Sequence, residues 1–167
     1  MNKIVLFSLL GMTDPTRDNY DGPFLHILRH YQPAKTYLFM TQEICVYDNV
    51  DNRYEILAKR LARDCEIIKL RHEEIDNPHE FGLLDDLFKQ ILRIIREENP
   101  GYEIIMNLSS GTTQMLSALY MLCAVGKRPV TGIQVLTLLL FIFIELTPRK
   151  GTETKNSKLQ IILHCTH

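Results

Sequence analysis

Short apolar runs alternate with longer amphipathic segments over the first 135 residues of the chain. A short apolar run bounded by turn residues is typical of a buried strand, whereas apolar residues at every third or fourth position are typical of a helix. The clearest helix is predicted over 81–98, because its apolar residues form one stripe. The predicted strands are 4–10, 36–40, 65–70, 102–107 and 130–135, and the predicted helices are 24–31, 51–64, 81–98 and 115–125.

This alternation predicts a doubly wound α/β fold of the Rossmann-like class, in which a mainly parallel sheet carries helices on both faces. Such folds bind ligands beyond the carboxyl ends of the strands, where the order of the strands reverses. Two turns rich in small and polar residues follow predicted strands, at 11–14 and 109–114. We therefore expect a ligand site between these two turns.

The pattern changes after residue 135. Residues 136–146 are densely apolar, 147–157 are polar and charged, and 158–167 form a short end without a clear cap. Two strands joined by a long connection fit this pattern. We therefore divide the chain into a Rossmann-like domain over 1–135 and an atypical tail over 136–167.

The turn at 109–114 has the composition of a phosphate cradle. Its glycine lets the backbone approach a ligand closely, and the amides of a first helical turn are unpaired donors. A helix cap needs one Ser or Thr, so the surplus of hydroxyls here favours a ligand site over capping alone. The candidate ligand-binding residues from both turns are Gly11, Met12, Thr13, Asp14, Asn107, Ser109, Ser110, Gly111, Thr112, Thr113 and Gln114.

Charge and motifs exclude several classes of protein. The formal net charge is −1, which argues against duplex DNA as a partner but not against a small anion at a helix N-terminus. The sequence contains no G-x-x-x-x-G-K-[ST], no G-x-G-x-x-G and no G-x-S-x-G motif. We therefore expect no cofactor, and the residues alone assign no catalytic group.

The histidines and cysteines do not suggest a metal centre. His26 and His30 lie four positions apart on a predicted helix, but no third ligand is indicated, so a packing or capping role is expected. The cysteines have no C-x-x-C spacing and are expected to be reduced thiols. They are Cys45, Cys65, Cys123 and Cys165.

The apolar segments do not predict a membrane protein. The first seven residues lack the long apolar core and cleavage site of a signal peptide, and the apolar stretch 135–146 is too short to span a bilayer. We therefore expect a cytoplasmic location and no membrane partner.

Two separated motifs resemble a known family, the type III CRISPR-associated accessory ribonucleases. The N-terminal motif comprises residues 4–8, 11–15 (GMTDP), 21–27 and 31–33. The second motif, NLSSGTTQM at 107–115, is similar to that family's second signature turn, where the position of Thr113 is often proline. Order and spacing are kept from about residue 1 to residue 135.

The resemblance implies a CRISPR-associated Rossmann-fold (CARF) sensor domain. Such domains form homodimers whose two-fold groove binds a cyclic oligoadenylate in antiviral defence, and binding activates a separate C-terminal HEPN ribonuclease domain. The signature of that ribonuclease, an Arg followed by four to six residues and a His, does not occur in this sequence. The resemblance ends near residue 135, and a truncated or frameshifted continuation is one explanation of the tail.

Three functions remain open. The first is a binding module for the cyclic oligoadenylate. The second is a slow, metal-independent ring nuclease, in which Thr13, Asn107 and the turn 109–113 align a ribose 2′-hydroxyl for in-line attack. No His or Lys is evidently placed as a base, which ranks cleavage second. The third is an unrelated α/β nucleotide-binding protein, because a fold does not fix a function.

Overall fold

The computed structural model describes the backbone of residues 3–17, 20–76, 78, 80–125, 131–138, 140–147 and 158–163, and side chains only within 3–16, 20–76, 78, 80–124 and 131–133. The elements are β1 (Ile4–Leu9), β2 (Thr16–Arg17), β3 (Tyr20–Asp21), α1 (Pro23–Tyr31), β4 (Lys35–Thr41), α2 (Gln42–Asp51), α3 (Arg53–Leu61), β5 (Glu66–His72), α4 (Phe81–Glu98), β6 (Glu103–Asn107), α5 (Thr113–Val125), β7 (Thr131–Leu138), β8 (Leu140–Thr147) and β9 (Lys158–Leu163).

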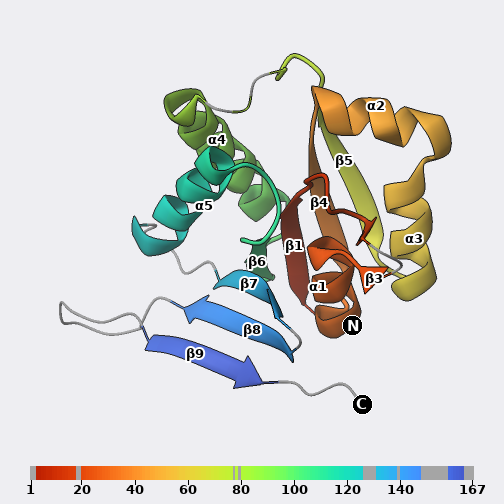
Figure 1. The fold of residues 1–167 in the computed structure, drawn as a ribbon. Coiled ribbons are helices and arrows are strands. Elements are labelled where there is room, and N and C mark those ends of the chain that lie inside the picture. Colours follow the sequence, from red (N-terminus) through yellow and green to blue (C-terminus); the bar gives the residue numbers. More distant parts are fainter. Residues whose placement is uncertain are drawn as a thin grey trace.

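The large sheet has the strand order β5-β4-β1-β6-β7-β8-β9 (Figure 1). The pairs from β5 to β7 are parallel, whereas β8 and β9 add to the sheet as antiparallel strands. The chain builds outward from β1 through β4 to β5, and then continues on the other side of β1 with β6. The order of the strands therefore reverses at β1, and the predicted doubly wound, mainly parallel sheet is confirmed.

Helices cover both faces of the parallel strands, with α4 and α5 on one side and α1, α2 and α3 on the other (Figure 1). Successive side chains of a strand point to opposite faces. Accordingly Val5, Phe7 and Leu9 enter the core beneath α4 and α5, while Leu6 enters the core beneath α1 to α3. All four side chains are fully buried. A strand covered on both faces reads as a continuous apolar run, which is why the pattern identified β1.

The helix predicted over 51–64 is present as α3, with narrower bounds, whereas α2 was not predicted. The chain forms α2 and α3, separated by Asn52, whose φ of +52° lies in the left-handed region that Asn tolerates better than most residues. Hydrophobic periodicity missed α2 because its buried face includes a charged residue, Asp48, which lies 2.8 Å from the ammonium of Lys69. Its apolar residues Val46 and Val50 are exposed.

The ends of two strands also differ from the predictions. The first strand ends at Leu9, and the strand expected over 130–135 is β7, which runs to Leu138. Beyond it, β8 and β9 match the expected two strands, while their connection at 148–157 lies outside the described residues. The division of the chain at residue 135 stays a prediction. Among the described helices, none has the length and apolar character needed to cross a membrane.

Candidate functional site

The two small, polar turns lie side by side at the carboxyl edge of the sheet. Strands β1 and β6 pair in parallel with Ser8 opposite Asn107, so the turns that follow them meet. Together they line a cleft of about 390 Å³. Its walls are formed by Leu10, Gly11, Met12, Thr13, Thr41, Glu43, Ile44, Pro78, Ser109, Ser110, Gly111, Thr112 and Met115. The expected crevice between the turns at 11–14 and 109–114 is therefore present.

Asn107 holds the second turn from below the cleft. Its side chain is fully buried, and its Nδ2 donates to the hydroxyl oxygens of Ser8 at 2.9 Å and Ser110 at 3.1 Å. Its Oδ1 accepts a hydrogen bond from the amide of Ser109 at 2.9 Å. Asn107 therefore fixes the shape of the turn and does not itself line the cleft.

Asp14 joins both turns to the start of α1. Its carboxylate accepts hydrogen bonds from the amides of Phe24, at 3.0 Å, and Gly11, at 3.2 Å. Burial raises the pKa of Asp14 above its ordinary value, and hydrogen bonds from Ser110, Phe24 and Gly11 oppose that rise. Because Asp14 is 6% exposed and does not line the cleft, its place is structural: it secures the floor of the site.

Two glycines keep the backbone of the second turn uncovered. Gly111 has a φ of +108°, a conformation that a residue with a side chain rarely adopts. A Cβ atom at Gly11 would lie 2.9 Å from the amide nitrogen of Gly111 and would cover it. Within the described part of the chain, the amides of Ser110, Gly111 and Thr112 donate to no acceptor. The cleft wall thus carries three successive amides able to bind an anion.

Thr112 is also a helix cap. Its Oγ1 accepts a hydrogen bond from the amide of Met115 at 3.3 Å and donates to the carbonyl of Pro78 at 2.9 Å. The capping interpretation thus holds for this hydroxyl, whose capping bond occupies one of the donors at the start of α5. Thr113 is exposed and Gln114 half-buried, and neither lines the cleft.

Sequence reasoning missed one wall of the cleft. Thr41, Glu43 and Ile44 come from the junction of β4 and α2, and Pro78 comes from the loop before α4. The available signal was the position of Thr41 and Glu43 directly after a predicted strand, at the edge where ligands bind. Among the described lining residues of the cleft, Glu43 carries the one charged side chain.

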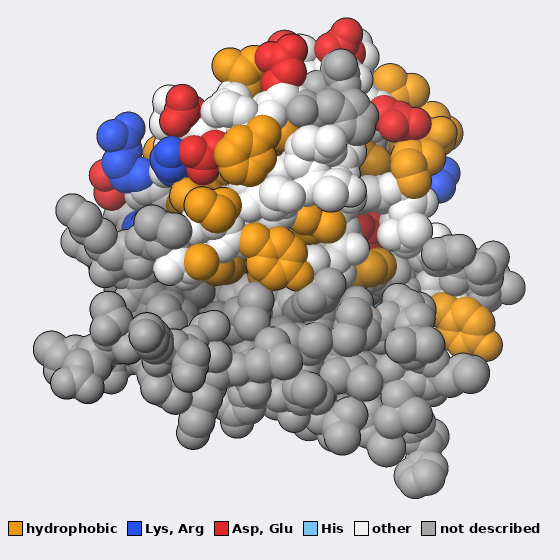
Figure 2. Space-filling model, turned by 60° about the vertical axis from the view of Figure 1, so that its left-hand side comes forward, with side chains coloured by type: hydrophobic (Ala, Val, Ile, Leu, Met, Phe, Trp, Pro, Cys, Tyr) orange, Lys and Arg blue, Asp and Glu red, His pale blue; other side chains and the backbone are white. Residues whose placement is uncertain are grey.

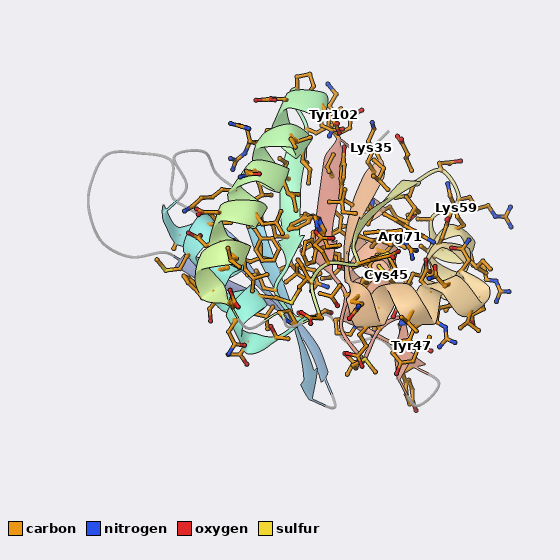
Figure 3. The ribbon with its side chains drawn as sticks, turned by 90° about the horizontal axis from the view of Figure 1, so that it is seen from above. Lys35, Cys45, Tyr47, Lys59, Arg71 and Tyr102 are labelled. Carbon is orange, nitrogen blue, oxygen red and sulfur yellow. The ribbon has the colours of Figure 1, made fainter. Side chains whose placement is uncertain are left out.

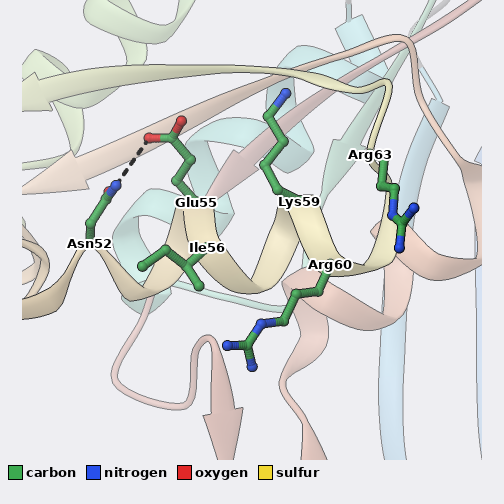
Figure 4. A pocket seen from close by; sticks show the side chains of 6 residues that line it. All are labelled: Asn52, Glu55, Ile56, Lys59, Arg60 and Arg63. Carbon is green, nitrogen blue, oxygen red and sulfur yellow. Dashed lines mark hydrogen bonds between the residues drawn. The ribbon is translucent and has the colours of Figure 1, made fainter.

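A second hollow, of about 440 Å³, lies on α3 and holds more charge. Its walls are Asn52, Glu55, Ile56, Lys59, Arg60 and Arg63, and we call it the α3 hollow. The ammonium of Lys59 donates to the carbonyl of Cys65 at 2.7 Å. Figure 4 shows the guanidinium groups of Arg60 and Arg63 pointing in different directions. These cations do not converge on one point, so we assign no ligand to the α3 hollow.

Cysteines and histidines form no second chemical site in the described ranges. Cys45, Cys65 and Cys123 are buried free thiols, and burial raises the pKa of each. Cys45 lies where α2 passes the end of β5, near Arg71 (Figure 3). No group of three His, Cys, Asp or Glu side chains is arranged to hold a metal ion in that part of the chain. Burial lowers the pKa of His26 on α1.

Comparison with known proteins identifies similar sequences. Residues 64–139 match the family model described as the Cas_Csm6 CARF domain. A CRISPR system endoribonuclease Csm6 of Mycobacterium tuberculosis is 38% identical over 136 residues, which cover 80% of this chain and 32% of the relative. The Csm6 of Enterococcus italicus is 34% identical over 120 residues, which cover 69% of this chain and 28% of the relative. The chain thus spans about a third of the length of the curated relatives it matches.

Solved structures agree with these sequence matches. The structure of Enterococcus italicus Csm6 bound to cyclic hexa-2′-fluoro-hexa-dAMP has a TM-score of 0.75 and 32% identity, covering 83% of this chain and 35% of that chain. Can2 from Sulfobacillus thermosulfidooxidans, in complex with cyclic tetra-adenylate, has a TM-score of 0.50 and 19% identity, covering 78% of this chain and 31% of that chain. The second likeness concerns the fold alone.

Proposed function

Because this chain carries a CARF domain of the Csm6 family, we propose that it binds a cyclic oligoadenylate of type III CRISPR defence in the cleft between its two glycine-containing turns. The observation that carries this proposal concerns the backbone amides of Ser110, Gly111 and Thr112, beside the first turn of α5. Within the described residues these amides donate no hydrogen bond. Backbone amides at a helix N-terminus bind phosphate. The Enterococcus relative with its bound cyclic hexanucleotide supports a ring-shaped ligand for this chain too.

The charge of the cleft supports a ligand held by backbone donors. No Lys, Arg or His is among the described residues that line it. Phosphates would therefore be bound by amides and by the partial positive charge of the α5 N-terminus, neither of which changes with pH. The same lack of a cationic or imidazole group ranks ring cleavage below binding, because a general base other than a carboxylate is not at hand among the lining residues.

A homodimer forms the second part of the proposal. A ring with internal two-fold symmetry suits a two-fold dimer in which one patch meets its own copy. Exposed apolar side chains at the carboxyl edge favour such a contact: Met12 is 60%, Phe81 42% and Leu83 68% exposed. Figure 2 shows hydrophobic side chains between polar and acidic ones on the side that carries α4 and α5. We place the contact near the ends of β1 and β6.

Light scattering tests the assembly. A protein of twice the chain mass at tens of micromolar is expected, with Leu83→Asp shifted toward monomer because a charge would be buried in the contact. Leu83 is exposed in the single chain, so this change should leave the circular dichroism spectrum of the folded protein unaltered. A strictly monomeric parent protein would contradict the dimer.

Calorimetric titration with cyclic tetra-adenylate and cyclic hexa-adenylate tests the ligand. We expect one of the two rings to bind, and a linear adenylate of equal length to bind at least about tenfold more weakly because it must be ordered first. Chromatography of the ligand after incubation separates binding from cleavage. Failure of both rings to bind a folded protein would overturn the proposal and leave the unrelated nucleotide-binding interpretation.

The ribonuclease activity of the longer relatives is a separate matter. Since the Arg-to-His signature does not occur in this sequence, we expect the chain as given to cleave no single-stranded RNA, with or without the ring. A ring-dependent RNA cleavage that survives repurification would contradict this expectation.

A further inference from the structure

One side chain of the cleft is unsuited to phosphate. Glu43 lies in the first turn of α2, is exposed, and lines the cleft opposite the two turns. Within the described residues its carboxylate makes no ion pair and no hydrogen bond. An ionised carboxylate only accepts hydrogen bonds, and it repels other negative groups. A ligand that contacts Glu43 in this cleft is therefore favoured when it turns a hydrogen-bond donor, and not a phosphate, toward the carboxylate.

The residues around Glu43 suit the flat face of a base. Met12 is the exposed apolar side chain of the same cleft, since Leu10, Ile44 and Met115 are almost fully buried. Thioethers make favourable contacts with aromatic rings, and Met12 is 60% exposed and thus accessible to one. The polar amides of Ser110 to Thr112 stand on another wall, so phosphates and bases have separate places.

We propose that Glu43 is the group that recognises the base, accepting a hydrogen bond from the exocyclic amine of one adenine of the ring. This inference rests on the proposed function and deepens it by naming a specificity-determining residue. Adenine carries one exocyclic donor at its pairing edge, and an ionised carboxylate is a strong acceptor for it. The amides of Ser110 to Thr112 bind a phosphate whatever its base, whereas Glu43 determines which base is bound.

Two other roles of Glu43 predict different results. A carboxylate in the first turn of a helix also complements the helix dipole, which would affect stability and not base preference. A carboxylate at the end of a strand in a nucleotide-binding sheet can instead accept from a ribose hydroxyl, which would make binding depend on the 2′-position.

A double-mutant cycle between protein and ligand separates these roles. The ligands are whichever of cyclic tetra-adenylate and cyclic hexa-adenylate binds the parent chain, its counterpart built from purine riboside (the amine replaced by hydrogen), and its 2′-fluoro counterpart. The proteins are the parent chain, Glu43→Ala, Glu43→Gln and the control Glu80→Ala. Glu80 is an exposed carboxylate directly before α4 and lies outside the cleft. It therefore reports the general effect of removing a negative charge near phosphates.

The expected result is that removal of the exocyclic amine weakens binding to the parent chain but hardly changes binding to Glu43→Ala. Removing the amine should weaken binding to the parent and to Glu80→Ala by at least about tenfold, and to Glu43→Ala by less than about twofold. Glu43→Gln, which keeps an acceptor of the same size without the charge, should fall between them. Melting curves of all four proteins should coincide.

Three outcomes would overturn the inference. An equal amine dependence in the parent and Glu43→Ala would show that Glu43 does not touch the amine, while ring binding itself stands. A dependence on the 2′-position that disappears in Glu43→Ala would assign the carboxylate to ribose. A parent chain that binds neither cyclic tetra-adenylate nor cyclic hexa-adenylate would remove this inference together with the proposed function.

Discussion

The cleft at the carboxyl edge and the α3 hollow differ in the way they present positive potential. The hollow has two arginines and a lysine, yet their charged groups point apart or bond to the backbone. The cleft has no cation among its described lining residues, yet three successive amides in its wall make no hydrogen bond to a described acceptor. Convergence of donors on one point, and not the number of charges, distinguishes a site from a solvated surface.

The supporting residues explain this difference. Beneath the cleft, Asn107, Ser8, Ser110 and Asp14 form a buried polar network that fixes where each amide points. The side chains of the α3 hollow come from α3 and the residues at its two ends, and the exposed arginines among them retain their rotamer freedom. A preorganised site binds without the cost of ordering its own groups.

The largest expected effect comes from breaking the network that makes the cleft different. Asn107→Ala should lower the free energy of unfolding by about 3 kcal/mol or more, because it leaves two hydroxyl oxygens and one amide buried without their partner. Denaturant titration measures the change. The control is Asn49→Ala, whose exposed side chain bonds only to Arg71 and should change stability by less than about 0.5 kcal/mol. Equal effects of the two changes would contradict the network.

Displacing the backbone of the second turn should abolish the advantage of the cleft, because an added carbon at Gly11 would clash with that turn. In Gly11→Ala the new Cβ would lie 2.9 Å from the amide nitrogen of Gly111, so ring binding should weaken by at least about tenfold. The matched control is Gly82→Ala, where no atom lies within 4 Å of the added carbon and the helix should gain up to about 1 kcal/mol. Titration calorimetry and melting curves measure both. Unchanged affinity in a folded Gly11→Ala protein would remove the amides from the site.

The pH dependence of stability reports the buried carboxylate of the network. Burial raises the pKa of Asp14 in the folded state, so its favourable contribution is complete below its ordinary pKa and is lost as the pH rises through the folded value. Relative to Asp14→Asn, which does not titrate, the parent chain should therefore become less stable from about pH 4 toward neutral pH. Denaturant titrations at stepped pH measure this difference. A parent that gains stability over the variant with rising pH would contradict the assignment.

The smallest effect is expected in the α3 hollow. Arg60→Ala combined with Arg63→Ala removes two exposed cations that have no ion pair within the described residues. Because exposed charges are screened at physiological salt, ring affinity should change by less than about twofold. Calorimetry at two salt concentrations tests this. A tenfold loss would move the ligand to the hollow and reverse the comparison.

Much of this arrangement could be predicted from the sequence, for identifiable reasons. Strand β1 is buried on both faces and so reads as an apolar run, and the turn at 109–114 carries more hydroxyls than a cap needs. Helix α2 could not be found this way, since Asp48 faces inward against Lys69, a residue far away in sequence. Because α2 was not predicted, Glu43 was not assigned to a helix, and its place after a predicted strand was the one available signal.

The roles within the site were also beyond the sequence. Asp14 and Asn107 were expected to touch the ligand, and whether any residue of the set does so stays a prediction. Their burial shows that they hold backbone in place, a distinction that depends on contacts between residues far apart in the chain. Residue type alone cannot separate a polar side chain that faces a cleft from one that supports it.

The hydrogen bond between Ser8 and Asn107 joins residues 99 positions apart, and it has a consequence for refolding. Closing a loop of that length costs entropy before any contact compensates, and pairings of distant strands are slow to form. Helices α1 to α4 can acquire their local backbone bonds before β1 and β6 meet, so circular dichroism would register recovered helix in chains that still lack the cleft. Binding of the ring would be measured only for molecules in which β1 has paired with β6. It is therefore a stricter assay of a refolded sample than circular dichroism.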